Sequence, residues 1–292
     1  MTPGKDAIMT QVSAPHPSAA ESGAAATQRF FADKSGGAAA TSKERVDQLA
    51  REVLAAVHEI IRKHHVTYEE YNALKGWLIQ VGQDGEWPLF CDVWLEYVIE
   101  EVAHADRQGS KGTIEGPYFV PGAPELGSDA TLPMREGEKG SPLMFTGQVR
   151  ALDGTPLAGA KLEVWHADDD GYYSQFAAGI PQWNLRGTLT TDADGRFTIR
   201  TIQPAPYQIP TDGACGRLIA AAGWHAWRPA HLHLKTSADG YLPITTQLYF
   251  PGDPHNDDDI ASAVKPELML TLEPTADGTG KQTSYDFVLD PA

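Results

Sequence analysis

The sequence predicts a mainly β protein, in which an antiparallel β-sandwich follows a region of helices. Between residues 41 and 109, apolar side chains recur at the three- and four-residue spacing of amphipathic helices. From residue 110 the pattern changes to short β-branched runs separated by turn dipeptides such as Asp-Gly. Several short strands without intervening helices are typical of a sandwich. We therefore divide the chain into a tail at 1–40, a helical region at 41–109 and a β-sandwich domain at 110–292.

The first forty residues are expected to form a disordered tail. Ala, Ser, Gly, Pro and Thr dominate this stretch, so it cannot bury enough apolar surface to offset the entropy of ordering. Its start, Met-Thr-Pro-Gly-Lys-Asp, lacks the apolar core of a secretory signal, and no run approaches the roughly 18 apolar residues of a membrane span. We expect a cytoplasmic protein that does not insert into membranes.

Capping signals mark the starts of two helices. Thr41 with Glu44 fits a capping box, and apolar positions at helical spacing then continue to about Lys63. Thr67 with Glu70 repeats the signature, and a Gly-Gln-Asp-Gly sequence ends the second helix.

A third helix is expected to begin at Pro88 and to end near Gly109, because proline suits a first helical turn. The apolar faces of the helices are unusually aromatic. Trp77, Trp94 and Tyr97 in particular exceed what covering one face of a sheet requires. Such an apolar surplus indicates an interface.

The β domain is expected to contain seven strands, joined partly by turns with an Asp-Gly signature. The segment Asp168-Asp169-Asp170-Gly171 lacks the spaced ligands of a calcium loop and is read as one of these turns. The candidate strands lie at 144–150, 160–166, 186–191, 196–202, 230–236, 244–250 and 284–289.

Charge and cysteine content exclude some classes of function. The formal net charge is −16, and nucleic-acid binding needs a basic face to displace counterions, so no nucleic-acid partner is expected. The chain has 2 cysteines, too few for a disulfide scaffold. Cys91, in a predicted helix, and Cys215, in a predicted loop, are expected to be reduced thiols.

A metal site is indicated by His231 and His233, which alternate on one strand and therefore share a face. An iron(II) site would need a carboxylate beside them, and only Asp239, in a predicted turn, follows closely. A zinc site completed by Asp253 or by a member of 257–259 stays open. Tyrosine phenolates, which suit hard trivalent iron, are the remaining candidates, but composition does not select any one of them.

Two stretches resemble the iron-binding motifs of the intradiol ring-cleavage dioxygenases. The first runs from Val164 to Ser174 and holds the sequence Asp-Gly-Tyr-Tyr, and the second combines 204–210 with Trp-Arg-Pro-Ala-His-Leu-His at 227–233. The segments 113–118 and 245–250 and the helices also match the family. Within it the greatest likeness is to catechol 1,2-dioxygenases of the actinobacterial type, seen in 76–79, 86–90, 257–263 and 287–292.

This resemblance implies an Fe(III) ion held by Tyr173, Tyr207, His231 and His233. It implies that Tyr207 leaves the metal when substrate binds. Arg228 would stabilise negative charge developing on the substrate ring, and Gln247 would assist by hydrogen bonding. The implied pocket is mostly apolar and would hold a flat ring between Leu78, Ile114, Pro117, Tyr118, Ile260 and Ala261.

The implied reaction is the opening of catechol by O2 to cis,cis-muconate. A preference for chlorocatechols or hydroxyquinol is the first alternative, because the sequence around Tyr207 also occurs in enzymes of that kind. A β-sandwich that binds a ligand without chemistry is the second. The resemblance further implies that the helices pair two protomers into a homodimer and enclose a tunnel that can hold phospholipid.

Overall fold

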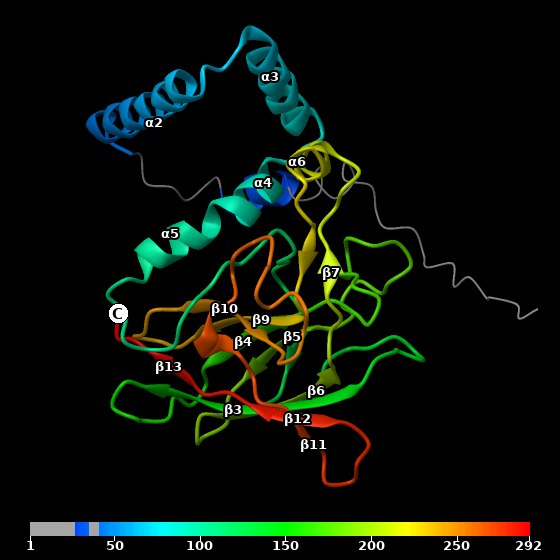
Figure 1. Ribbon diagram of the computed structural model, residues 1–292. Helices are drawn as coiled ribbons and strands as arrows, with labels where there is room; N and C mark the ends of the chain where they lie inside the picture. The colour runs from blue at the N-terminus through cyan, green and yellow to red at the C-terminus, as the bar shows by residue number, and fades with distance from the viewer. Residues whose placement is uncertain (1–26, 35–40) are drawn as a thin grey trace, which may run out of the picture.

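A computed structural model describes residues 27–34 and 41–292 (Figure 1). Most of the expected N-terminal tail lies outside these residues, but 27–34 are helical and include the short π-helix η1, Phe30–Lys34. Four α-helices follow: α2 (Lys43–His64), α3 (Tyr68–Gln83), α4 (Trp87–Trp94) and α5 (Glu96–Ala103). No helix within the described ranges is both long and apolar enough to cross a membrane.

The helix starts follow the predicted caps closely, but the third helix is divided. Ser42 rather than Thr41 caps α2, whereas the capping box of Thr67 and Glu70 is formed at α3. The single helix expected from Pro88 to Gly109 is wrong, because the chain breaks at Leu95 into α4 and α5 and leaves helical geometry after Ala103.

Two β-sheets form the sandwich. The first has the order β1-β5-β4-β9-β10, and the second has the order β11-β12-β3-β6-β2, with β13 also paired to β3. Strands β7 and β8 form a separate ribbon. The strands are β1 (Glu125–Leu126), β2 (Asp129–Thr131), β3 (Pro142–Ala151), β4 (Lys161–Trp165), β5 (Arg186–Thr190), β6 (Arg196–Ile202), β7 (Tyr207–Gln208), β8 (Trp227–Arg228), β9 (His231–Ser237), β10 (Ile244–Tyr249), β11 (Glu273–Pro274), β12 (Lys281–Ser284) and β13 (Phe287–Leu289).

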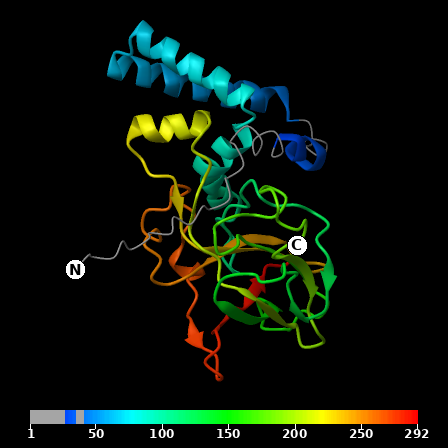
Figure 2. The same cartoon turned by 90° about the vertical axis from the view of Figure 1, so that its right-hand side faces the viewer.

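The expected sandwich is confirmed, with two corrections. The central pairs β3–β6, β4–β5, β4–β9 and β9–β10 are antiparallel, but β1, β2, β12 and β13 each pair in parallel with a neighbour, so both sheets are mixed. An additional helix, α6 (Ala214–Ala222), interrupts the β domain, and the predicted loop residue Cys215 lies in it. In Figures 1 and 2, α6 lies beside α3, above the sandwich.

The side chains on the two faces of β9 pack into two different hydrophobic clusters. Leu232 and Leu234 point between the sheets, where they pack in a cluster with Phe145, Phe197 and other buried apolar residues. A second buried cluster lies between the outer face of the first sheet and the helices, and it includes Trp165, Tyr173 and Tyr207. Because side chains alternate along a strand, His231 and His233 face this second cluster.

Candidate active site

The two histidines lie on β9, which runs between β4 and the edge strand β10 in the first sheet. Their Nε2 atoms are 3.0 Å apart, and the residues are 2% and 1% exposed. The Nδ1–H of His231 donates to the carbonyl of Pro229 at 2.7 Å. This bond fixes the tautomer of His231 so that the lone pair of Nε2 points into the site.

Tyr173 reaches the histidines from the turn after β4. Its hydroxyl is 3.3 Å from Nε2 of His231 and 3.1 Å from Nε2 of His233. The Asp168 carboxylate builds the turn by accepting the backbone N–H groups of Asp170 and Tyr172. The expected turn at 168–171 is therefore present, and its aspartate is used for backbone hydrogen bonds.

The end of this turn is held by a residue that the sequence analysis did not select. Arg186 on β5 is buried, and its guanidinium donates to the hydroxyl and carbonyl of Ser174 and to the carbonyl of Tyr118. The aromatic ring of Tyr118 in turn stacks on that of Tyr173, with centroids 4.6 Å apart. Arg186 thus fixes two segments around the Tyr173 ring.

Tyr207 lies on the ribbon of β7 and β8, where its backbone is the register partner of Arg228. Its ring lies edge-on to that of Tyr173, with centroids 5.5 Å apart. Gly171 makes this approach possible, because a Cβ atom built on it would lie 2.8 Å from Cβ of Tyr207. Gly171 also has a φ of +86°, a conformation that L side chains rarely adopt.

Burial controls the protonation of these four groups. It lowers the pKa of His231 to about 3, with the charge of Arg228 adding to the effect, and it lowers the pKa of His233 well below its ordinary value. Burial raises the pKa of both Tyr173 and Tyr207, whereas the Arg228 charge opposes that rise. The histidines are therefore neutral, and the two hydroxyls keep their protons unless a cation is bound between them.

The donor set fits a hard transition-metal ion. Two neutral imidazole nitrogens and two phenol oxygens meet in a buried site, and a trivalent ion would reverse the rise of the tyrosine pKa values. Asp239, the carboxylate of the iron(II) alternative, is exposed in the turn after β9. Two aspartates of the zinc alternative are occupied elsewhere: Asp253 accepts the N–H groups of Ala230 and His255, and Asp259 is paired with Arg228.

Arg228 lies beside the histidines in a dense hydrogen-bond network. Nε and one terminal nitrogen bind the two oxygens of Asp259, at 3.0 and 3.1 Å. The same terminal nitrogen donates to Oε1 of Gln247 at 2.9 Å. The other terminal nitrogen lies 3.4 Å from Nε2 of His231. Asp259 and the neighbouring phenol of Tyr207 raise the pKa of Arg228 despite its burial, so it remains charged.

Gln247 is held by three hydrogen bonds. Its Oε1 accepts hydrogen bonds from Arg228 and from the hydroxyl of Tyr249, and its Nε2 donates to the carbonyl of Ile114 at 2.9 Å. The structure therefore places Gln247 behind Arg228, where it supports the guanidinium.

The residues expected to form the pocket are only partly brought together. Ile114, Tyr118 and Ala261 belong to the buried cluster that contains both tyrosines, and Ile260 packs against it. Leu78 is 38% exposed on α3, and Pro117 lines a separate hollow beside Phe119. A cavity of about 400 Å³ opens onto the tyrosines, and its lining includes Tyr118, Tyr173, Phe176, Tyr207, Ile209 and Trp227.

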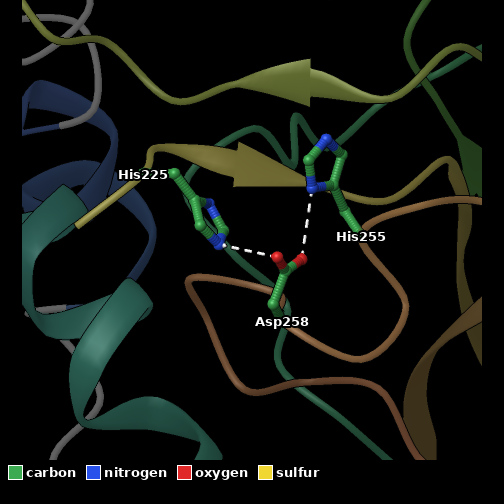
Figure 3. A group of neighbouring side chains, drawn as sticks. All are labelled: His225, His255 and Asp258. Carbon is green, nitrogen blue, oxygen red and sulfur yellow. Dashed lines mark hydrogen bonds and ion pairs between the residues drawn. The ribbon is translucent and has the colours of Figure 1, made fainter.

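A second polar cluster lies on the surface beside β8 (Figure 3). The Asp258 carboxylate contacts Nε2 of His225 at 3.2 Å and Nδ1 of His255 at 3.1 Å. The N–H of Trp227 donates to Nδ1 of His225, which places the proton of His225 on Nε2, facing Asp258. To bind a metal through Nε2, His225 would have to carry its proton on Nδ1, where it would clash with the backbone N–H of Trp227. We therefore interpret the cluster as a hydrogen-bonded clamp that joins the loop of His225 to the loop of His255 and Asp258.

Comparison with known proteins matches almost the whole region from α2 to β13. Residues 43–111 match the family model described as catechol dioxygenase N terminus, and 114–291 match the model described as dioxygenase. The chain is 42% identical over 250 residues to a chlorocatechol 1,2-dioxygenase of Rhodococcus opacus, covering 84% of this chain and 97% of that protein.

Other relatives agree with this result. The crystal structure of a 3-chlorocatechol 1,2-dioxygenase from Rhodococcus opacus 1CP superposes with a TM-score of 0.83 at 48% identity, covering 86% of this chain and 100% of that one. A catechol 1,2-dioxygenase of Acinetobacter baylyi is 36% identical over 235 residues, covering 77% of this chain and 76% of that protein.

Proposed function

The chain belongs to the family of intradiol ring-cleaving dioxygenases, and we propose that it opens chlorocatechols and related aromatic diols with O2 at the site between β9, β7 and the turn after β4. The observation that carries the proposal is the convergence of Tyr173, His231 and His233 within 3.3 Å of one another, with the ring of Tyr207 beside them. This set contains donors for a metal and lacks a carboxylate.

Fe(III) is the cofactor that we propose for these four side chains. When bound, it would draw electron density from a chelated catecholate and so make a ring carbon reactive toward O2. The protein's part is to present two neutral imidazoles and two phenolates in a buried site from which bulk water is excluded. The fixed tautomer of His231 is one component of that preorganisation.

Tyr207 is the proposed acceptor of a substrate proton. Its hydroxyl oxygen is made more basic by burial, whereas the nearby charge of Arg228 keeps the phenolate accessible. The Tyr173 hydroxyl, in contrast, contacts both histidines and lies on a turn anchored by Arg186. We therefore propose that Tyr173 would hold the ion and that Tyr207 would take up a proton from the substrate.

Arg228 is the proposed stabiliser of negative charge on the substrate. It is buried and charged, and one of its terminal nitrogens faces the nitrogen of His231 that would hold the metal. A guanidinium in a dry site stabilises a developing anion far more than it would in water.

The substrate preference departs from the expectation drawn from the sequence. The sequence resemblance implies catechol itself as the substrate. The comparisons support chlorocatechols better, because the chain is 42% identical to a chlorocatechol 1,2-dioxygenase and 36% identical to a catechol 1,2-dioxygenase. We test this by measuring kcat/KM for catechol, 3-chlorocatechol, 4-chlorocatechol and hydroxyquinol. A chlorocatechol should have the highest value, with chloromuconates as products, and higher values for catechol or hydroxyquinol would contradict this preference.

Colour tests the proposed ligands separately from turnover. Charge transfer from tyrosinate to Fe(III) should make the purified protein red, and anaerobic catechol should shift the absorption band. Tyr173→Phe and Tyr207→Phe should each change the band, whereas Tyr285→Phe, a control at a partly buried tyrosine that packs against the sandwich core, should leave it unchanged. An unaltered spectrum in both site variants would refute the ligand assignment.

The helical region supports a proposal of homodimerisation. No residue of α2 is buried, although the helix carries an apolar stripe that includes Leu49, Val53, Leu54, Val57 and Ile61. Light scattering after size exclusion should give twice the chain mass of 31.6 kDa, and Leu54→Glu should shift the protein toward monomer. Phospholipid in this region is a separate proposal, and mass spectrometry of an organic extract of the purified protein tests it.

A further inference from the structure

We propose that Asp259 is a positioning residue that directs one terminal nitrogen of Arg228 toward the substrate. This inference rests on the proposed function and extends it to a residue that the sequence analysis considered only as one member of the acidic run 257–259 that could complete a zinc site. The observation behind it is the two-point contact between the Asp259 carboxylate and the side of the guanidinium, at 3.0 and 3.1 Å.

Most of the hydrogen-bond donors of Arg228 are assigned to partners on one edge of the guanidinium. A guanidinium has five N–H groups in a fixed plane. Asp259 takes the Nε–H and one hydrogen of a terminal nitrogen, and Gln247 takes the other hydrogen of that nitrogen. The second terminal nitrogen takes no part in these three hydrogen bonds, and it lies 3.4 Å from Nε2 of His231. Since the guanidinium is planar, fixing one edge fixes the direction of the other.

Asp259 is itself held rigidly enough to perform this role. The N–H of Ala261 donates to one carboxylate oxygen and the N–H of Ala263 to the other, both at 3.2 Å. The N–H of Ile260 donates to the carbonyl of Trp227, which joins the loop to β8 next to Arg228. The Asp259 side chain is 2% exposed, so the ion pair is shielded from water and from salt.

Burial also distinguishes Asp259 from its two neighbours. Asp257 and Asp258 are exposed, and Asp258 belongs to the surface clamp with His225 and His255. Three consecutive aspartates thus have three different environments, and only the third faces the site. Asp257 offers a matched control, because Asp257→Asn makes the same chemical change in the same loop.

The test uses the iron-loaded enzyme and the substrate with the highest kcat/KM. Asp259→Asn keeps the side-chain shape but removes the charge and places an N–H₂ group against the guanidinium. We expect iron content and the tyrosinate band to be retained, KM to change by less than about threefold, and kcat to fall by about 10- to 100-fold. Asp257→Asn should behave like the wild type.

A double-mutant cycle separates positioning from a merely structural role. If Asp259 acts through Arg228, adding Asp259→Asn to Arg228→Ala should lower kcat little further, although each single change lowers it strongly. Multiplicative losses in the double variant, or a wild-type kcat for Asp259→Asn, would overturn the inference. If the Asn variant does not fold, Asp259→Glu decides in its place: a reduced kcat with iron retained supports positioning, and an unchanged kcat refutes it.

Failure of the proposed function gives a different pattern. A wild-type enzyme that cleaves no diol, or a fully active Arg228→Ala, would remove the role of Arg228 itself. An active wild type with an impaired Arg228→Ala and a normal Asp259→Asn would remove only the role of Asp259.

Discussion

The indole of Trp165 lies flat against the imidazole of His233, with ring centroids 4.6 Å apart and planes inclined by 10°. The two residues are register partners on β4 and β9. Unlike His231, whose Nδ1 is bonded to Pro229, His233 has no hydrogen-bond partner for its buried Nδ1 in the described part of the chain. Because Nδ1 has no partner, stacking on Trp165 restrains the plane of the His233 ring in place of a hydrogen bond at that nitrogen.

Removing the indole should loosen the metal site. We expect Trp165→Leu to lower iron affinity by about tenfold, because groups that orient a metal ligand typically contribute tenfold or more. The measurement is iron content after dialysis against a graded series of chelator concentrations. Trp165→Phe, which keeps an aromatic face, should lose much less iron.

A loss of core volume alone should not have this effect. Phe145→Leu is the matched control, because Phe145 is equally buried but packs between the sheets, away from the site. Equal iron loss in Phe145→Leu and Trp165→Leu would show that the stack with His233 has no special role.

Gly171 is predicted to set the position of Tyr207. Gly171→Ala adds a Cβ atom 2.8 Å from Cβ of Tyr207 and must push the two segments apart. The tyrosinate band should shift, and iron should be held less tightly. Gly154→Ala is a control with the same backbone strain, since its φ is +87° but no atom lies within 4 Å of the added Cβ. Backbone strain should cost each variant about 1 kcal/mol of stability, and Gly171→Ala should lose more because of the close contact with Tyr207. A band shift in both variants would contradict the prediction.

Arg228→Ala is predicted to retain iron and lose most turnover. Removing a preorganised donor to a developing anion typically lowers kcat by about 100- to 1,000-fold. Iron content, the visible spectrum and kcat are measured on the same preparation, so that loss of the metal is not mistaken for loss of catalysis. A normally active, iron-loaded variant would exclude the proposed role.

The parts of the site that sequence predicts are those encoded by local pattern. The alternation around His231 places both imidazoles on one face, and the Asp-Gly turn delivers Tyr173, so the local geometry of both motifs is readable. The choice of tyrosines needs the family resemblance, because no spacing rule relates Tyr173 or Tyr207 to the histidines.

The parts that sequence misses depend on contacts between distant segments. Helix α6 lacks a side-chain cap of its own, and the N–H of Cys215 instead donates to the buried carboxylate of Glu86, 129 residues earlier. Asp259 stands in an acidic run that is indistinguishable from a solvated loop, and only the fold brings it to Arg228. The strands that pair in parallel are short and likewise depend on their neighbours.

His166 is predicted to make stability depend on pH. It is buried, with Nδ1 at the carbonyl of Ala167 and Nε2 at the hydroxyl of Thr201, both at 2.7 Å. Burial lowers its pKa to about 4, whereas the unfolded value is about 6.5. Between these values the unfolded chain binds the proton and the folded chain does not, so stability falls as pH decreases through this window.

This loss should amount to about 2 kcal/mol between pH 7.5 and pH 5 for His166 alone. Urea unfolding of the iron-loaded wild type and of His166→Gln, at both pH values, measures the difference attributable to this residue. The variant should be less stable at pH 7.5 but should lose less on acidification. Between pH 8.5 and 7.5, where the histidine is neutral in both states, the two proteins should show the same dependence. If the wild type and His166→Gln lose the same stability between pH 7.5 and pH 5, His166 is not the source of this pH dependence.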